Sequence, residues 1–162
     1  MLLQPKPGQD SRVPGLQLEL FADGIPVTVI ADTAVGYLMS KGMIRKVIVG
    51  ADRITSDGYV FNKIGTYQIA VLAAEHRIPF YVAAPSSTFD LKTARNEVVI
   101  EEREAKEMAI IGRKRIVPKG VRVFNPVFDE TPPTFVESII TEKGIILPPY
   151  VESIRRTIPD RI

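Results

Sequence analysis

Apolar residues occur in short continuous runs along the first half of the chain, and segments with helical spacing separate these runs. The runs are IPVTVIAD (25–32), MIRKVIVGAD (43–52) and IPFYVAAP (78–85). Between them, residues 33–42 form a helical pattern, and a longer one runs from Ile64 to about His76. Apolar strands that alternate with helices are typical of parallel sheets. The pattern predicts an α/β, Rossmann-like domain, with a mostly parallel sheet and helices on both faces.

Shorter elements are expected around this alternating part. Residues 16–24 predict a helix that ends at Gly24, since glycine after the last periodic residue commonly stops a helix. The polar stretch RITSDGYVFNK (53–63) predicts a turn. The second half predicts a short strand and a charged helical turn over 97–111, and a strand over 119–129.

The C-terminal part predicts one more helix, one strand and a tail. Residues 131–144 carry the signals of a helix: Thr131 as a cap, prolines in the first turn and Gly144 as the stop. A short strand follows. We therefore expect an irregular arm over 1–15, a single Rossmann-like domain over 16–150 and a tail over 151–162.

The composition excludes several kinds of site. The chain of 162 residues has no cysteine and one histidine, which excludes disulfides, thiolate metal sites and multi-histidine sites within the chain. A net charge of +2 gives no basic surface for nucleic acid, and no segment is apolar enough for a membrane span. No phosphate-loop or dinucleotide motif occurs. We expect a cytoplasmic protein without metal or organic cofactor, whose acid–base chemistry falls to carboxylates, lysines or tyrosines.

Three aspartates follow the predicted strands: Asp32, Asp52 and Asp90. Ligands of open parallel sheets bind outside the carboxyl ends of the strands, so these residues are expected to converge on one edge. Helix capping or a turn is the alternative role, and it weighs more for Asp32 and Asp90 than for Asp52. At a dry floor of such a crevice, desolvation would raise the pKa of Asp52 and suit it to act as a general acid.

The pair Asn62-Lys63 is expected to open the long helix. Backbone N–H groups and the helix dipole favour an anion there, and a lysine adds positive charge. The pair therefore suggests a phosphate site, while a solvated lysine beside a capping asparagine is the alternative.

Several motifs appear in the same order as in methylthioribose-1-phosphate isomerases. These are VGADRI, NKIGTY, IPFYVAAPSSTFD, VIEER, FNPVFDETP and IITEKGII. The segment GIPVTVIADTAVGYLMSKGMI resembles the part that precedes them in archaeal-type members. The resemblance runs from about Gly24 to Tyr150 and extends to ribose-1,5-bisphosphate isomerases and to the α, β and δ subunits of translation initiation factor 2B.

The resemblance implies an aldose–ketose isomerase that converts 5-methylthioribose 1-phosphate to 5-methylthioribulose 1-phosphate in methionine salvage. It implies that Asp52 is the proton donor and that Asn62 and Lys63 contact the substrate and its phosphate. The family also has an Arg-Gly-Ala loop, a further arginine and a catalytic cysteine, which this sequence lacks. The family also has a substrate-binding glutamine just before the segment that resembles LQLEL. An ungapped alignment places Ser11 at its position, and the nearest glutamine in this sequence is Gln9.

These departures leave three hypotheses. The chain is the catalytic half of an isomerase and is poorly active alone, or one chain of a split isomerase with a separate N-terminal-half chain. Alternatively, it is a regulatory module like the initiation-factor subunits, which binds a sugar phosphate or nucleotide without catalysis. The expected partners are a phosphorylated sugar and a second copy of the chain, since family members dimerise and FVESIITEKGIILPPY (135–150) offers an apolar seam.

Overall fold

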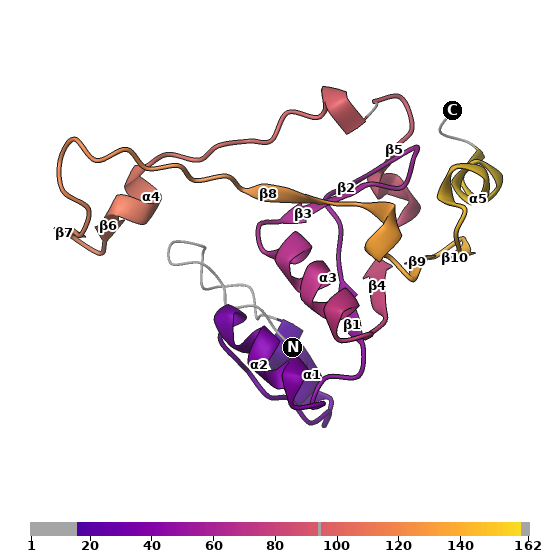
Figure 1. Ribbon diagram of the computed structural model, residues 1–162, viewed down its shortest axis with the longest axis horizontal. Coiled ribbons are helices and arrows are strands. Elements are labelled where there is room, and N and C mark those ends of the chain that lie inside the picture. The colour runs from indigo at the N-terminus through magenta and orange to yellow at the C-terminus, as the bar shows by residue number, and fades with distance from the viewer. Residues whose placement is uncertain (1–15, 94, 160–162) are drawn as a thin grey trace.

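The computed structural model describes residues 16–93 and 95–159, and these form two four-stranded sheets with helices packed around them (Figure 1). The predicted α/β class is confirmed. The expected arm over 1–15, with Gln9 and Ser11, lies outside the described residues.

The first sheet has the strand order β1-β4-β9-β10. Its strands are β1 (Val47–Val49), β4 (Phe80–Ala83), β9 (Ser138–Thr141) and β10 (Gly144–Ile146). The pairs β1–β4 and β4–β9 are parallel, and β9–β10 is antiparallel. This sheet is thus mostly parallel, and the strands predicted over 43–52 and 78–85 supply two of its members.

The two faces of the first sheet differ in exposure. The side chains of Phe80, Val82 and Ile139 point to one face of the sheet, and each is at most 1% exposed. Ile48 and Ile145 lie on the other face and are 63% and 65% exposed. Side chains alternate between faces along a strand, so one side of this sheet forms the core while the other is open.

The second sheet has the order β5-β2-β3-β8. Its strands are β2 (Arg53–Thr55), β3 (Val60–Lys63), β5 (Phe89–Asp90) and β8 (Phe128–Thr131). Only β2–β5 is parallel. The predicted turn over 53–63 is therefore wrong, since this stretch forms the β2–β3 hairpin. Ile54 and Val60 are fully buried, and burial of these two side chains fixes a hairpin that the short polar pattern did not indicate.

Three helices match the predicted pattern. These are α1 (Leu16–Ala22), α2 (Val35–Ser40) after a 3₁₀ turn at Asp32–Ala34, and α3 (Thr66–Glu75), which ends next to His76. Helix α2 packs against α3. The element boundaries follow the local signals because i, i+3 and i, i+4 spacing is a property of the segment itself.

Two further predicted elements are wrong. Residues 25–31 form no strand, and Val29 is 53% exposed. The helix predicted over 131–144 is instead a 3₁₀ turn, Pro133–Phe135, followed by β9. In the first case no described strand pairs with the segment to complete a ladder. In the second, Ile139 and its β-branched neighbours pair with β4, and tertiary pairing overrides local helix signals.

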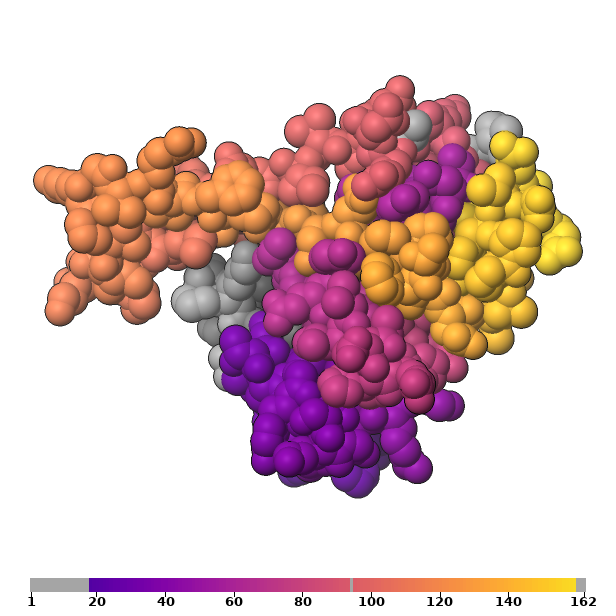
Figure 2. Space-filling view, in the orientation of Figure 1, coloured from indigo at the N-terminus to yellow at the C-terminus, as the bar shows by residue number. Residues whose placement is uncertain are grey.

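Residues 97–127 form an arm that extends from the body (Figures 1 and 2). The arm carries α4 (Lys106–Ala109) and a hairpin of β6 (Ile110–Ile111) and β7 (Lys114–Arg115). The charged helical turn predicted within 97–111 is thus present as α4. The strand predicted over 119–129 is largely wrong, since β8 begins only at Phe128.

The C-terminal segment forms helix α5 (Tyr150–Thr157), which belongs to the core. Ile154 and Ile158 are fully buried in the same cluster as Val82 and Ile139. The hydroxyl of Tyr150 donates a hydrogen bond of 2.9 Å to the carbonyl of Val136. Helix α5 therefore stabilises the end of the first sheet.

Candidate functional site

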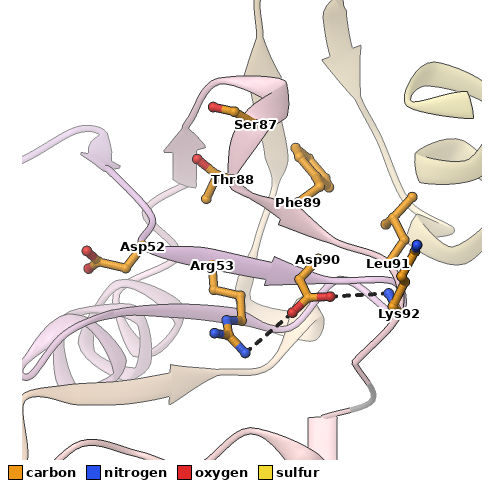
Figure 3. A pocket seen from close by; sticks show the side chains of 8 residues that line it. All are labelled: Asp52, Arg53, Ser87, Thr88, Phe89, Asp90, Leu91 and Lys92. Carbon is orange, nitrogen blue, oxygen red and sulfur yellow. Dashed lines mark hydrogen bonds and ion pairs between the residues drawn. The ribbon is translucent and has the colours of Figure 1, made fainter. Parts of the chain in front are cut away.

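Asp52 stands where the chain passes from the first sheet into the second. Its backbone N–H donates to the carbonyl of Phe61 at 2.9 Å, which ties the start of β2 to β3. The residue is exposed, so the expected dry crevice floor is not found in the described chain. Figure 3 shows its carboxylate directed away from the ion pair of Arg53 and Asp90.

Two cavities meet at Asp52. One, of about 490 Å³, is lined by Asp52, Ser87 and Asp90, among others (Figure 3). The other, of about 250 Å³, is lined by Asp52, Phe61, Phe128 and residues at the base of the arm. Asp52 can therefore contact a ligand in either cavity.

Asp90 lies in the first of these cavities but has structural partners. Its carboxylate accepts N–H groups from Lys92 and Thr93 and pairs with Arg53 at 3.4 Å. Hydrogen bonding from Thr93 lowers the pKa of Asp90. These contacts are those of a turn, the alternative role expected for this residue. Asp32 starts a 3₁₀ turn, is exposed and lines neither cavity.

Asn62 and Lys63 end strand β3 and do not open the helix. The helix begins three residues later, at Thr66. Asn62 pairs with Asp129 in the strand register and Lys63 with Phe128. Consecutive strand residues leave opposite faces of a sheet, so the two side chains diverge.

The two side chains accordingly have different surroundings. The Nδ2 group of Asn62 donates to Oγ1 of Thr66 at 3.1 Å. The ammonium of Lys63 lies 5.6 Å from the ring centre of Phe128, which also lines the smaller cavity with Asp52. Lys63, at the end of β3, thus lies beside an aromatic side chain that lines the same cavity as Asp52, which precedes β2.

The N-terminus of α3 already holds an anion, the carboxylate of Asp129 from β8. Its two oxygens accept the N–H groups of Gly65 at 2.6 Å and Tyr67 at 3.1 Å. Burial raises the pKa of Asp129, and the two hydrogen bonds oppose this shift. The expected phosphate position on the helix dipole is therefore filled by the chain itself.

No local pattern in the sequence assigns a role to Asp129. It lies 64 residues beyond Gly65, and only the pairing of β3 with β8 brings the two together. The one available signal was an aspartate within FNPVFDETP, a motif quoted for the resemblance.

Among residues 16–93 and 95–159, no group of three or more histidine, cysteine, aspartate or glutamate side chains is arranged to hold a metal ion. In the same residues, no helix has the length and apolar character needed to cross a membrane.

Sequence comparison finds relatives that cover most of this chain. A methylthioribose-1-phosphate isomerase of Pelotomaculum thermopropionicum is 52% identical over 141 residues, which is 86% of this chain and 39% of that protein. A 5-deoxyribose 1-phosphate isomerase of Moorella thermoacetica is also 52% identical over 141 residues, which is 86% of this chain and 40% of that protein. The chain thus spans about 40% of the length of the relatives it matches.

Two solved structures have the same fold. Translation initiation factor eIF-2B, subunit delta, of A. fulgidus matches with a TM-score of 0.83 and 51% identity, over 90% of this chain and 43% of that one. 5-Methylthioribose 1-phosphate isomerase of Pyrococcus horikoshii matches with a TM-score of 0.81 and 42% identity, over 87% of this chain and 40% of that one. The sequence model of the Initiation factor 2 subunit family matches residues 13–148 of this chain. Since this match covers most of the chain, the protein belongs to the Initiation factor 2 subunit family.

Proposed function

We propose that this chain supplies the catalytic part of an aldose–ketose isomerase that converts 5-methylthioribose 1-phosphate to 5-methylthioribulose 1-phosphate. The observation that carries the proposal is that Asp52 lines the smaller cavity with Phe128, while the ammonium of Lys63 lies 5.6 Å from the ring centre of the same Phe128. A carboxylate in a cavity and an ammonium beside an aromatic residue of that cavity match a substrate that needs proton transfer at a sugar and neutralisation of a phosphate. Relatives bearing this name support the choice of substrate.

The reaction sets clear demands on the site. Phosphate blocks the anomeric carbon, so the ring C–O bond must break while a hydrogen moves from C2 to C1 and the C2 hydroxyl becomes a carbonyl. One group must manage protons at the ring oxygen, and another must assist the transfer between carbons. We assign the first role to Asp52. Asn62 and Lys63 orient the sugar and its phosphate.

The isolated chain provides only part of this machinery. Asp52 is exposed, and the sequence has no cysteine to act beside it. We therefore expect full activity to need further residues, either from a longer form of the protein or from a separate N-terminal-half chain. A coupled assay of the chain with cell extract would detect such a partner.

The experiment that tests the substrate site is calorimetry with 5-methylthioribose 1-phosphate. Lys63→Ala should weaken binding by about tenfold or more, because a charge-assisted contact to an anion contributes about 1–3 kcal/mol. The matched control is Lys92→Ala, which removes a lysine from the larger cavity on the other side of Asp52. Loss of affinity in the control alone would move the substrate to that cavity, and equal affinity in all three proteins would contradict the role of Lys63.

A regulatory role is the second candidate, favoured by the A. fulgidus structure named as a subunit of eIF-2B. Such a module would bind a sugar phosphate or nucleotide without turning it over. Capture of initiation-factor components by the tagged chain, together with nucleotide binding that survives Asp52→Asn, would support this candidate over the enzyme.

We also propose that two copies of the chain associate through the segment 135–150. Ile140 and Ile145 face each other in the β9–β10 register and are 37% and 65% exposed. They lie on the open face of the first sheet, where an apolar surface favours association.

A further inference from the structure

The turn between β3 and α3 directly follows both proposed substrate contacts, and several hydrogen bonds hold it. The hydroxyl of Thr66 donates to the carbonyl of Lys63 at 2.7 Å and accepts from Asn62 at 3.1 Å. The N–H of Ile64 donates to the carbonyl of Val127 at 2.9 Å. The backbone at Gly65 has φ of 104°, a conformation open mainly to glycine.

Asp129 closes this turn from outside. It bonds to Gly65 and Tyr67, the residues on either side of Thr66. It is also the direct cross-strand neighbour of Asn62, so both side chains leave the same face of the sheet. A single half-buried carboxylate therefore fixes the end of β3, the turn and the first turn of α3 relative to one another.

We propose that Asp129 is a positioning residue for the sugar-phosphate site: it holds the turn that sets the directions of Asn62 and Lys63. This inference rests on the proposed function for its effect on substrate, but its structural part stands independently. Without the carboxylate, the N–H groups of Gly65 and Tyr67 lose their acceptor. The turn then loses its bonds to the Asp129 side chain of β8 and keeps the bond from Ile64 to the carbonyl of Val127.

The alternative is that Asp129 only caps a helix. Capping by itself stabilises α3 and leaves the ligand contacts of β3 unchanged. The two roles therefore differ in what they predict for Asn62, which lies before the helix, and for affinity at equal stability.

The test compares Asp129→Asn with two controls. Asparagine keeps the size of the side chain, but its Nδ2 group is a donor and cannot accept the hydrogen bond from one of the two backbone N–H groups. Glu130→Gln also removes one negative charge from β8. Glu130 follows Asp129 directly, lies on the opposite face of the sheet and pairs with Arg95. Tyr150→Phe removes a buried hydrogen bond far along the chain and controls for lost stability.

Two measurements decide the outcome. Nuclear magnetic resonance should show faster amide exchange at Gly65 and Tyr67 and shifted Asn62 side-chain amide signals in Asp129→Asn, but not in the controls. Calorimetry with 5-methylthioribose 1-phosphate should show affinity weakened by about tenfold in Asp129→Asn, as for loss of a direct charged contact, and little changed in the controls.

Each result that differs from these expectations leads to a different conclusion about Asp129 or about the proposed function. Unchanged Asn62 signals overturn the positioning role, whatever the ligand does. Shifted Asn62 signals with full affinity reduce Asp129 to a support of the fold. If the wild-type chain binds no 5-methylthioribose 1-phosphate, the proposed function fails, and the Asn62 signals alone decide whether Asp129 sets the turn.

Discussion

Gly58, at the tip of the β2–β3 hairpin, lies directly against Tyr150, the first residue of helix α5. A Cβ atom on Gly58 would stand 2.7 Å from Cβ of Tyr150, closer than packed atoms tolerate. This contact joins the second sheet to the C-terminal helix. It makes the hairpin tip a part of the core.

Gly58→Ala should therefore destabilise the fold. Gly58 has φ of +83°, and the left-handed conformation costs alanine about 1–2 kcal/mol before any clash. Overpacking against Tyr150 adds about 1–3 kcal/mol. Denaturant unfolding should show a lower free energy of unfolding for the variant.

Two control variants separate these effects. Gly112 also has a positive φ, of +59°, but a Cβ atom built on it would have no atom of the kind that crowds Gly58 within 4 Å. Gly112→Ala should therefore show the conformational cost alone. Gly50→Ala has neither strain nor neighbours and should be nearly neutral. Equal stability of the Gly58 and Gly50 variants would contradict the contact with Tyr150.

The isolated chain should show essentially no isomerase turnover. Asp52 is exposed, and the chain has no cysteine that could act as the second group required for hydrogen transfer. Loss of one member of a cooperating set commonly lowers the rate by several orders of magnitude. Product formation from 5-methylthioribose 1-phosphate should therefore be equally low in wild type and in Asp52→Asn. Rapid turnover that disappears in Asp52→Asn would show that other residues complete the site.

The chain should form a homodimer in light scattering at micromolar concentration. Ile145→Lys should shift the mass to that of a monomer, because a charge on the open face of the first sheet would be buried without a partner. Val99→Lys is the control, since Val99 is 91% exposed but lies on the arm. A dimer broken by the Val99 change alone would move the interface to the arm, and a monomeric wild type would remove it.

Stability should depend on the pH through Asp129. Burial raises its pKa in the folded protein above the ordinary value of 3.8. A raised pKa means that the folded state binds the proton more tightly than the unfolded state does. The contribution of this proton to stability is therefore present at pH values below 3.8 and is lost as the pH rises through the folded-state pKa.

The measurement is chemical denaturation of wild type and Asp129→Asn across this acidic range. The stability of wild type relative to the variant should fall as the pH rises, because the variant has no titrating group at this position. A relative stability that rises with pH would mean that the two N–H bonds outweigh burial.

Local signals in the sequence account for much of the fold. The helical spacing after Ile64 marked α3 and its end near His76, and the apolar runs marked β1 and β4. Glycine stops also located the ends of α1 and α2, at Gly24 and Gly42, where φ is positive. Each of these features depends on residues within one or two turns of chain, so the segment carries its own information.

The misplaced elements depend on distant partners. Residues 25–31 have strand-forming side chains but no strand partner among the described residues, and a strand exists only when another completes its hydrogen bonds. Residues 138–141 carried helix signals yet pair with β4, more than 50 residues away. In both cases the deciding contact is remote in sequence.

The same division applies to the site. The sequence by itself determined the candidates for the chemistry: Asp52 after an apolar strand, and Asn62-Lys63 before a helix. Tertiary structure decided how they are arranged, because strand pairing is non-local. It sent Asn62 and Lys63 to opposite faces of a sheet, brought Phe128 beside Lys63, and placed the carboxylate of Asp129 where the sequence had indicated a phosphate.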